Sequence, residues 1–193
     1  MNKTAINYKN IYYPPGGILL WIIIFLELIT VGIALIFFVL SAKENPELFH
    51  TSRLQLNSTF GMINTIFLLT SGFFMAVTVK EFKSKNIQKS KKYLLVTMFF
   101  GILFLTLKSI EYSGELDAGL GIGHNTFFTY YWLLTLFHVI HVIVGLVILV
   151  SVYFGLKKEK ITTEIEDIEA SAAFWHMCDL IWLLLFPILY LIL

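Results

Sequence analysis

An uncharged run near the middle of the chain limits what this sequence can fold into. Residues 126–154 contain no Lys, Arg, Asp or Glu, and a helix of that length, rising about 1.5 Å per residue, exceeds the ~30 Å hydrocarbon core of a bilayer. His138 and His141 lie inside this run, and Gly145 follows four residues later on nearly the same helical stripe. Lipid offers imidazole no hydrogen-bond partner. We therefore predict a transmembrane helix whose narrow polar face packs against other helices.

The composition of the whole chain also indicates a membrane protein. Of its 193 residues, 58% are hydrophobic and 14% are charged, against about 25% charged in soluble proteins. The net charge of +1 gives no indication of a nucleic-acid partner. The fold class that we predict is all-α, a polytopic membrane protein in which residues 1–193 form a single domain. Five transmembrane helices are expected, at about 17–40, 61–79, 93–112, 127–154 and 170–193.

Lysine and arginine are unevenly divided between the two sides of these spans. The N-terminal tail and the second and fourth connectors hold most of them: Lys3, Lys9, Lys80, Lys83, Lys85, Lys89, Lys91, Lys92, Lys157, Lys158 and Lys160. The opposite side holds Lys43 and Arg53. By the positive-inside rule, the N-terminus is expected inside and the C-terminus outside. The third connector, residues 113–126, is then expected to be a flexible outer loop.

Ionisable side chains inside the predicted spans are candidate functional residues, because each is costly in a membrane unless it is paired or hydrated. Glu27 and Asp179 lie at similar depths in the first and last spans, and His176 precedes Asp179 by three residues. With His138 and His141 they are expected to form one polar cluster between the first, fourth and fifth spans. The interpretation that we favour is a cluster that holds helices together. A proton relay, or contact with lipid or a partner, is the alternative.

A second ionisable pair lies at the outer end of the third span. Lys108 and Glu111 are three residues apart, a spacing that brings two side chains together on a helix surface. A lysine near a helix end reaches toward the membrane surface with its ammonium group. We therefore expect Lys108 and Glu111 to pair at the membrane interface.

A haem or metal site in this chain is possible by residue type but is not what we expect. His138 and His141, three apart on one helix, cannot occupy opposite axial positions of one iron, so a bis-histidine haem would pair one of them with His176. His138, His141, His176 and Asp179 have suitable ligand types for a metal, yet this site would lie in the membrane interior. Cys178 is the single cysteine. We expect no catalytic residue and no bound cofactor or metal.

Four stretches, taken together and in order, resemble subunit III of the haem-copper oxidases. The C-terminal stretch, 175–182, resembles the tryptophan-histidine, aspartate and tryptophan pattern that closes this subunit, and 137–145 resembles its two-histidine and glycine helix. Residues 17–27, which include Trp21 and Glu27, resemble its glutamate-bearing helix, and 69–72, ending at Gly72, its small-residue helix. The resemblance runs from about residue 14 to 193. Gly72 and Gly145 are accordingly expected to be helix-packing positions.

The resemblance also indicates a form and a branch within that family. The chain is similar to the short, five-helix form that lacks the first two helices of the longest members, so a lipid cleft within the chain is in doubt. Residues 108–112 and 125–131 look more like the relatives that accompany nitric oxide reductases. Whether oxygen or nitric oxide is reduced depends on metal ligands in another chain, and both acceptors stay open here.

The function implied by the resemblance is that of a non-catalytic subunit of a respiratory electron transport complex. Such a subunit packs beside the catalytic subunit, which carries the haem and copper, stabilises it and supports its proton uptake and turnover. Membrane lipids and further small membrane subunits are additional expected partners, and the bacterial or archaeal cytoplasmic membrane is the expected location. The alternatives are a stand-alone membrane cytochrome b or quinone-reactive protein using the histidines, and a small proton carrier built on Glu27 and Asp179.

Overall fold

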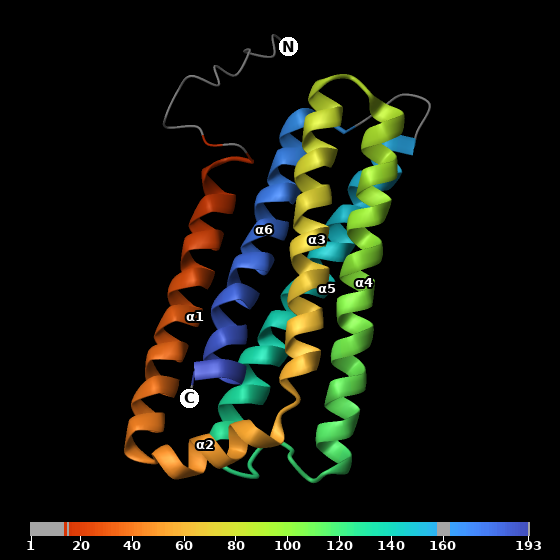
Figure 1. Cartoon of the computed structure of the whole chain (residues 1–193). Coiled ribbons are helices and arrows are strands. Elements are labelled where there is room, and N and C mark those ends of the chain that lie inside the picture. Colours follow the sequence, from red (N-terminus) through yellow and green to blue (C-terminus); the bar gives the residue numbers. More distant parts are fainter. Residues whose placement is uncertain (1–13, 15, 158–162, 193) are drawn as a thin grey trace.

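Five long helices run up and down in a bundle in the computed structural model, which describes residues 14, 16–157 and 163–192 (Figure 1). Their bounds are α1 Ile18–Glu44, α3 Ser58–Lys83, α4 Ile87–Asp117, α5 Thr126–Lys157 and α6 Ile165–Pro187. Each is long and apolar enough to cross a membrane, the last together with the π-helical turn Ile188–Ile192 that follows it. The predicted all-helical fold with five spans is therefore confirmed.

Two connectors differ from what the sequence indicated. The first contains a short helix, α2, at Pro46–Gln55, which begins with proline at a position where the missing N–H costs nothing. The third connector is shorter than expected, because α4 continues to Asp117 and includes Glu115, which is buried. These polar segments carry no membrane-length apolar signal, so hydropathy alone does not reveal that they are helical.

The sixth helix lies among the others and forms the centre of the bundle. Figure 1 shows α6 between α1 and α3, with α5 behind it, and α6 contacts all three. Its indole side chains Trp175 and Trp182 are fully buried. Proline ends the regular part of α6 at Pro187, since it cannot donate the next helical hydrogen bond. The π-helical turn beyond it carries Tyr190 into the interior.

The first helix stands at the edge of the bundle, and an aromatic cluster holds it at the α2 end. Phe38 of α1 makes edge contacts with Phe49 of α2 and Tyr130 of α5, at ring-centroid distances of 5.2 and 5.7 Å. Phe127 completes this aromatic cluster, 5.8 Å from Phe38. Away from this end most of α1 presents apolar side chains outward, as a helix bordering lipid or another protein does.

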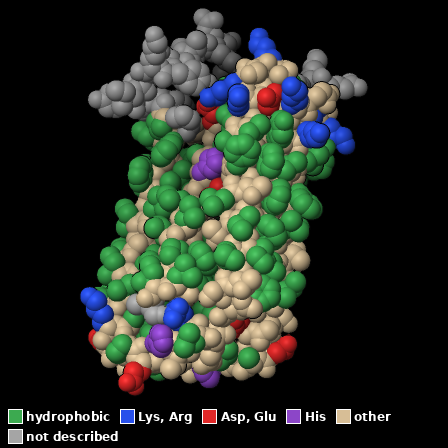
Figure 2. All heavy atoms as spheres, in the orientation of Figure 1, with side chains coloured by type: hydrophobic (Ala, Val, Ile, Leu, Met, Phe, Trp, Pro, Cys, Tyr) green, Lys and Arg blue, Asp and Glu red, His purple; other side chains and the backbone are tan. Residues whose placement is uncertain are grey.

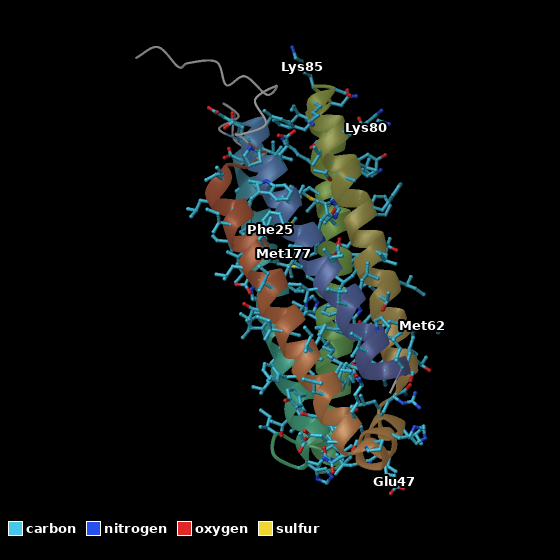
Figure 3. All side chains as sticks on the ribbon, turned by 90° about the vertical axis from the view of Figure 1, so that its left-hand side faces the viewer. Phe25, Glu47, Met62, Lys80, Lys85 and Met177 are labelled. Carbon is cyan, nitrogen blue, oxygen red and sulfur yellow. The ribbon has the colours of Figure 1, made fainter. Side chains whose placement is uncertain are left out.

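The two ends of the bundle differ in charge. Figure 2 shows an apolar band between them, with blue Lys and Arg side chains gathered at the end formed by α3 and α4. Lys80 and Lys85 lie at this lysine-rich end and Glu47 at the opposite, α2 end (Figure 3). Lys3, Lys9, Lys158 and Lys160, on which the predicted orientation also rests, lie outside the described residues. The orientation in the membrane therefore stays a prediction.

Candidate functional site

The first polar pair joins α1 to α5. Glu27 Oε1 lies 3.5 Å from His141 Nε2, and both side chains are largely but not completely buried, with 23% and 15% exposed. His141 Nδ1 lies 2.8 Å from the Phe137 carbonyl oxygen. A carbonyl only accepts, so Nδ1 carries a proton and donates it. A proton shared between Glu27 and Nε2 then gives a pair with no net charge, the arrangement that a membrane interior tolerates best.

The second polar pair lies within α6 and faces α3. His176 Nδ1 lies 3.2 Å from Asp179 Oδ2, one helical turn along. A Cβ atom added at Gly72 would collide with Asp179 Oδ2, so only glycine leaves room for this carboxylate against α3. The side chain of Asp179 is 10% exposed, whereas that of His176 is 45% exposed. The imidazole is therefore the accessible half of this pair.

The third candidate, His138, is isolated from both pairs. Its ring is fully buried, stacks against Trp182 at 5.3 Å between centroids and meets Phe104 edge-on at 5.5 Å. Neither ring nitrogen has a hydrogen-bond partner among the described residues. Aromatic rings thus occupy the space around the imidazole, and a haem ligated here would have to displace them.

The structure does not bring the five predicted residues into one cluster. Glu27 with His141, His176 with Asp179, and His138 alone occupy three places in the bundle. The reason is the direction of α6, which presents His176 and Asp179 toward α3 instead of toward α1 and α5. Similar depth in the membrane is readable from sequence, but the rotation of a helix about its axis is not.

An indole that the sequence pattern did not single out for packing locks four helices together. Trp175 of α6 lies between Gly101 of α4 and Gly145 of α5, where an added Cβ would come within 2.8 and 2.9 Å of its ring. Its Nε1–H donates to Ser71 Oγ of α3 at 3.1 Å, and Ser71 in turn donates to the Thr97 carbonyl oxygen at 2.8 Å. Gly145 is therefore part of a socket for Trp175.

The Lys108–Glu111 pair is the most completely buried ion pair described. Lys108 Nζ lies 3.0 Å from Glu111 Oε2, and each side chain is 1% exposed. Nζ also donates to the hydroxyl oxygens of Tyr131 and Tyr190, at 3.1 and 2.7 Å. Both phenols donate to Glu111 Oε1, at 3.0 and 2.5 Å. The ring of Trp182 lies 5.4 Å from the ammonium group.

This pair was expected at the membrane surface, and its position in the structure is different. The predicted partners are correct, but Lys108 does not reach toward water. Tyr131 of α5 and Tyr190 of the C-terminal turn bring hydroxyl groups to it inside the bundle, and such buried hydrogen bonds replace hydration. Tyr190 is 82 residues from Lys108 in the sequence, and no local sequence pattern predicts the contact between them.

No three of the described His, Cys, Asp and Glu side chains are arranged to hold a metal ion. Each candidate histidine contacts a different neighbour instead. His141 lies against the carboxylate of Glu27 in α1, and His176 against the carboxylate of Asp179 in α6. His138 packs between two aromatic rings. Cys178, the single cysteine, is fully buried and forms no disulfide. Glu27 and His141 thus join α1 to α5, and both this pair and the His176–Asp179 pair can hold a proton.

Comparison with known proteins identifies relatives over most of the chain. The family model for cytochrome c oxidase subunit III matches residues 16–192. Subunit 3 of the cytochrome bo(3) ubiquinol oxidase of Buchnera aphidicola is 29% identical over 131 residues, covering 67% of this chain and 64% of that protein. Cytochrome c oxidase subunit 3 of Rhipicephalus sanguineus is 31% identical over 131 residues, covering 67% of this chain and 49% of that protein.

A third relative joins two subunits in one polypeptide. The heme-copper oxidase subunit I+III of Aeropyrum pernix is 31% identical over 136 residues, which cover 68% of this chain and 16% of that protein. The chain thus spans less than two thirds of the length of the curated relatives it matches. The match nevertheless includes the polar pairs, the socket of Trp175 and the buried Lys108 cluster, since all lie within 16–192. The chain belongs to the cytochrome c oxidase subunit III family.

Proposed function

We propose that this chain is a non-catalytic subunit of a haem-copper oxidoreductase complex in a respiratory electron transport chain. It packs beside the catalytic subunit, stabilises it and supports its proton uptake and turnover, while haem and copper belong to that partner. The observation that carries the proposal is the family match over residues 16–192. The dispersal of His138, His141 and His176 among three different surroundings supports it, because a helix-joining role needs no convergence of ligands.

A catalytic subunit I is the partner that fits the proposal best. The relative from Aeropyrum pernix carries subunits I and III in its name as one chain, and covalent fusion favours parts that work side by side. The apolar outer faces of α1 and α5 supply the contact surface such a partner needs. Membrane lipids and further small membrane subunits are proposed to cover the rest of the apolar outer surface.

Support of proton uptake is assigned to the Glu27–His141 pair. Among the polar groups of the spans, this pair joins two ionisable side chains from different helices, 3.5 Å apart and both partly exposed. A carboxyl and an imidazole at this separation exchange one proton without changing the net charge of the pair. Glu27→Gln is therefore expected to slow turnover of the complex while leaving its assembly intact.

A finer assignment concerns the branch of the family. We propose that this chain belongs to the branch that accompanies nitric oxide reductases, on the resemblance of residues 108–112 and 125–131, two stretches that also meet in the structure. Lys108 of the first donates to the hydroxyl of Tyr131 in the second at 3.1 Å. The acceptor itself, oxygen or nitric oxide, is set by metal ligands of the partner subunit. Consumption of oxygen and of nitric oxide by the purified complex, measured side by side, tests the branch assignment. Activity with oxygen alone would contradict it.

The proposed location is the bacterial or archaeal cytoplasmic membrane, with the lysine-rich end inside. Lys80 and Lys85 lie at one end of the bundle (Figure 3), where Lys and Arg side chains gather (Figure 2), as the positive-inside rule requires of a cytoplasmic end. With that end inside, α6 begins inside and the C-terminal turn lies outside.

Removal of the chain from its complex tests the proposed function. The expected result is a catalytic subunit that keeps its haem and initial activity but loses activity faster during turnover. Re-adding the purified chain restores the lifetime, and re-adding a Gly145→Leu variant, whose added side chain displaces Trp175, does not. The proposal is contradicted if no haem-containing subunit co-purifies with the chain, or if its removal leaves both turnover and lifetime unchanged.

A further inference from the structure

We infer that the groove between α3 and α6 is the docking seam for a transmembrane helix of another subunit, and that His176 donates a hydrogen bond to an acceptor on that helix. The inference rests on the proposed function, since it needs a partner in the membrane. It assigns the α3–α6 face and the His176 imidazole to this contact, and family membership alone specifies neither of them.

The groove has the shape and composition of a helix-packing surface. It is an open groove of about 370 Å³, bordered by His176, Asp179, Gly72, Ala76 and Leu183. Gly72 is buried against Asp179, whereas Ala76, one turn further along α3, is exposed, and its small side chain leaves room for a second helix to approach closely within a membrane. Apolar side chains of both helices stand outward along its rims: Leu69, Phe73, Leu180 and Leu183.

A polar group at this position is unusual for a surface that borders lipid. The apolar part of α6 begins at about residue 170, so His176 lies about 9 Å inside it at 1.5 Å per residue. Its side chain is 45% exposed, and Nε2 has no hydrogen-bond partner among the described residues. Hydrocarbon cannot satisfy this nitrogen, and phospholipid headgroups lie nearer the membrane surface. A protein acceptor is the group that fits.

The Asp179 contact fixes what His176 offers to that partner. In the apolar groove the pair is stable with no net charge, either as carboxylate with imidazolium or as carboxylic acid with neutral imidazole. In the first form both ring nitrogens carry protons. In the second, Asp179 donates to Nδ1, so the single imidazole proton is on Nε2. Both forms therefore present an N–H donor from Nε2 to the groove, and the partner must supply an acceptor.

Asp179 itself adds an independent sign that the surface is incomplete. The residue is 7% exposed, and its Oδ1 atom is buried without a partner among the described residues. A buried carboxylate oxygen without a donor is costly. The Asp179 carboxylate packs closely against Gly72 of α3 and is therefore fixed in position. Because His176 contacts this carboxylate, the orientation of its imidazole is fixed too. The acceptor on the partner is expected to be a hydroxyl, an amide or a carboxylate oxygen.

Photocrosslinking in the intact, mildly solubilised complex tests the seam directly. A photoreactive benzoylphenylalanine replaces Ala76 in the groove, and in a matched control it replaces Ile102, an exposed residue of α4 that borders neither this groove nor the proposed subunit I surface of α1 and α5. The expected product from position 76 is a covalent adduct to a transmembrane peptide of another subunit, identified by mass spectrometry. An adduct of lipid or quinone mass at position 76, with no protein adduct, overturns the inference.

The hydrogen bond is tested by variants at His176. His176→Phe keeps the ring but removes the donor and should lower retention of the partner on the tagged chain by about 3- to 10-fold. His176→Asn, which keeps an N–H donor, should restore most of it. Because His176→Phe leaves Asp179 unpaired, the double variant His176→Phe with Asp179→Asn is measured too and should also retain less partner. Equal retention by wild type and both donor-lacking chains overturns the assigned atom.

The two levels of failure are distinguishable. Absence of any haem-containing partner on the wild-type chain contradicts the proposed function. A wild-type chain that retains its partner while position 76 crosslinks only to lipid or quinone leaves the proposed function in place and refutes the seam.

Discussion

At the scale of single residues, the buried Lys108 shows how a membrane bundle accommodates a charge away from water. Its ammonium group makes hydrogen bonds to Glu111, Tyr131 and Tyr190, which come from α4, α5 and the C-terminal turn. The donors and acceptors of this cluster match one another, so the cost of removing the charges from water is offset by bonds between elements. The cluster thus fixes the position of the chain's last turn.

Removal of the lysine alone should destabilise the bundle. Lys108→Met leaves Glu111 buried with two phenol donors but no counter-charge, and we expect the free energy of unfolding to fall by about 3 kcal/mol, the lower end for breaking a buried pair. Denaturant unfolding of the solubilised chain measures it. Lys92→Met, at an exposed position, is the control and should change little.

The double variant separates pairing from packing. Lys108→Met with Glu111→Gln removes both charges, and it should recover at least half of the lost stability, because no unpaired charge remains buried. If Lys108→Met is as stable as the wild type, or if the double variant is less stable than the single one, the ionic account of this cluster is wrong.

At the scale of elements, α6 holds the bundle together by inserting Trp175 into a socket. The glycines Gly101 and Gly145 provide its floor on α4 and α5, and Ser71 on α3 accepts its indole N–H. In lipid, helices gain little from burying apolar surface against each other, so close packing and hydrogen bonds carry the association. Four helices meet at this one side chain.

Filling the socket should therefore weaken helix association. Gly145→Ala places a Cβ about 2.9 Å from the Trp175 ring, and the overpacking should cost about 1–3 kcal/mol. Gly114→Ala is the matched control: it lies in α4 with open space around it, and the better helix propensity of alanine should raise stability by up to about 1 kcal/mol. Thermal unfolding of the two variants should thus shift in opposite directions. Shifts in the same direction would argue against the socket.

The sequence allowed the existence and approximate bounds of all five membrane helices to be predicted, because long apolar runs have few other stable solutions. It did not allow the helix rotations to be predicted. From residue 172 onward nearly every position in α6 other than His176 and Asp179 is apolar or aromatic, so periodicity does not indicate which face meets which helix. His176 is therefore expected, wrongly, to face α1 and α5 instead of α3. The contact between Lys108 and Tyr190 was also beyond reach, because it depends on the turn after Pro187.

At the scale of the whole molecule, the bundle has a lysine-rich end, an apolar middle and an α2 end with carboxylates and histidines (Figure 2). The ionisable pairs of the middle lie between helices or open into the groove between α3 and α6. Large apolar faces on α1, α3 and α5 stay exposed, which suits contact with lipid and with a larger membrane partner.

The predicted orientation is testable with single cysteines at the two ends. Glu47→Cys and Lys85→Cys lie at opposite ends of the bundle (Figure 3), and the native Cys178 is fully buried. A membrane-impermeant maleimide added to intact cells should label Glu47→Cys and should label Lys85→Cys only after the cells are opened. Labelling of Lys85→Cys in intact cells would reverse the orientation.

The most direct test of the account is the location of haem in the mildly solubilised complex. The tagged chain is purified with its companions, its subunits are then separated under conditions that keep haem bound, and visible absorption is measured for each. We predict that the haem absorption follows a larger companion and that this chain is colourless. A Soret band on this chain that disappears in His138→Ala or His176→Ala would contradict the account, and would favour a membrane cytochrome.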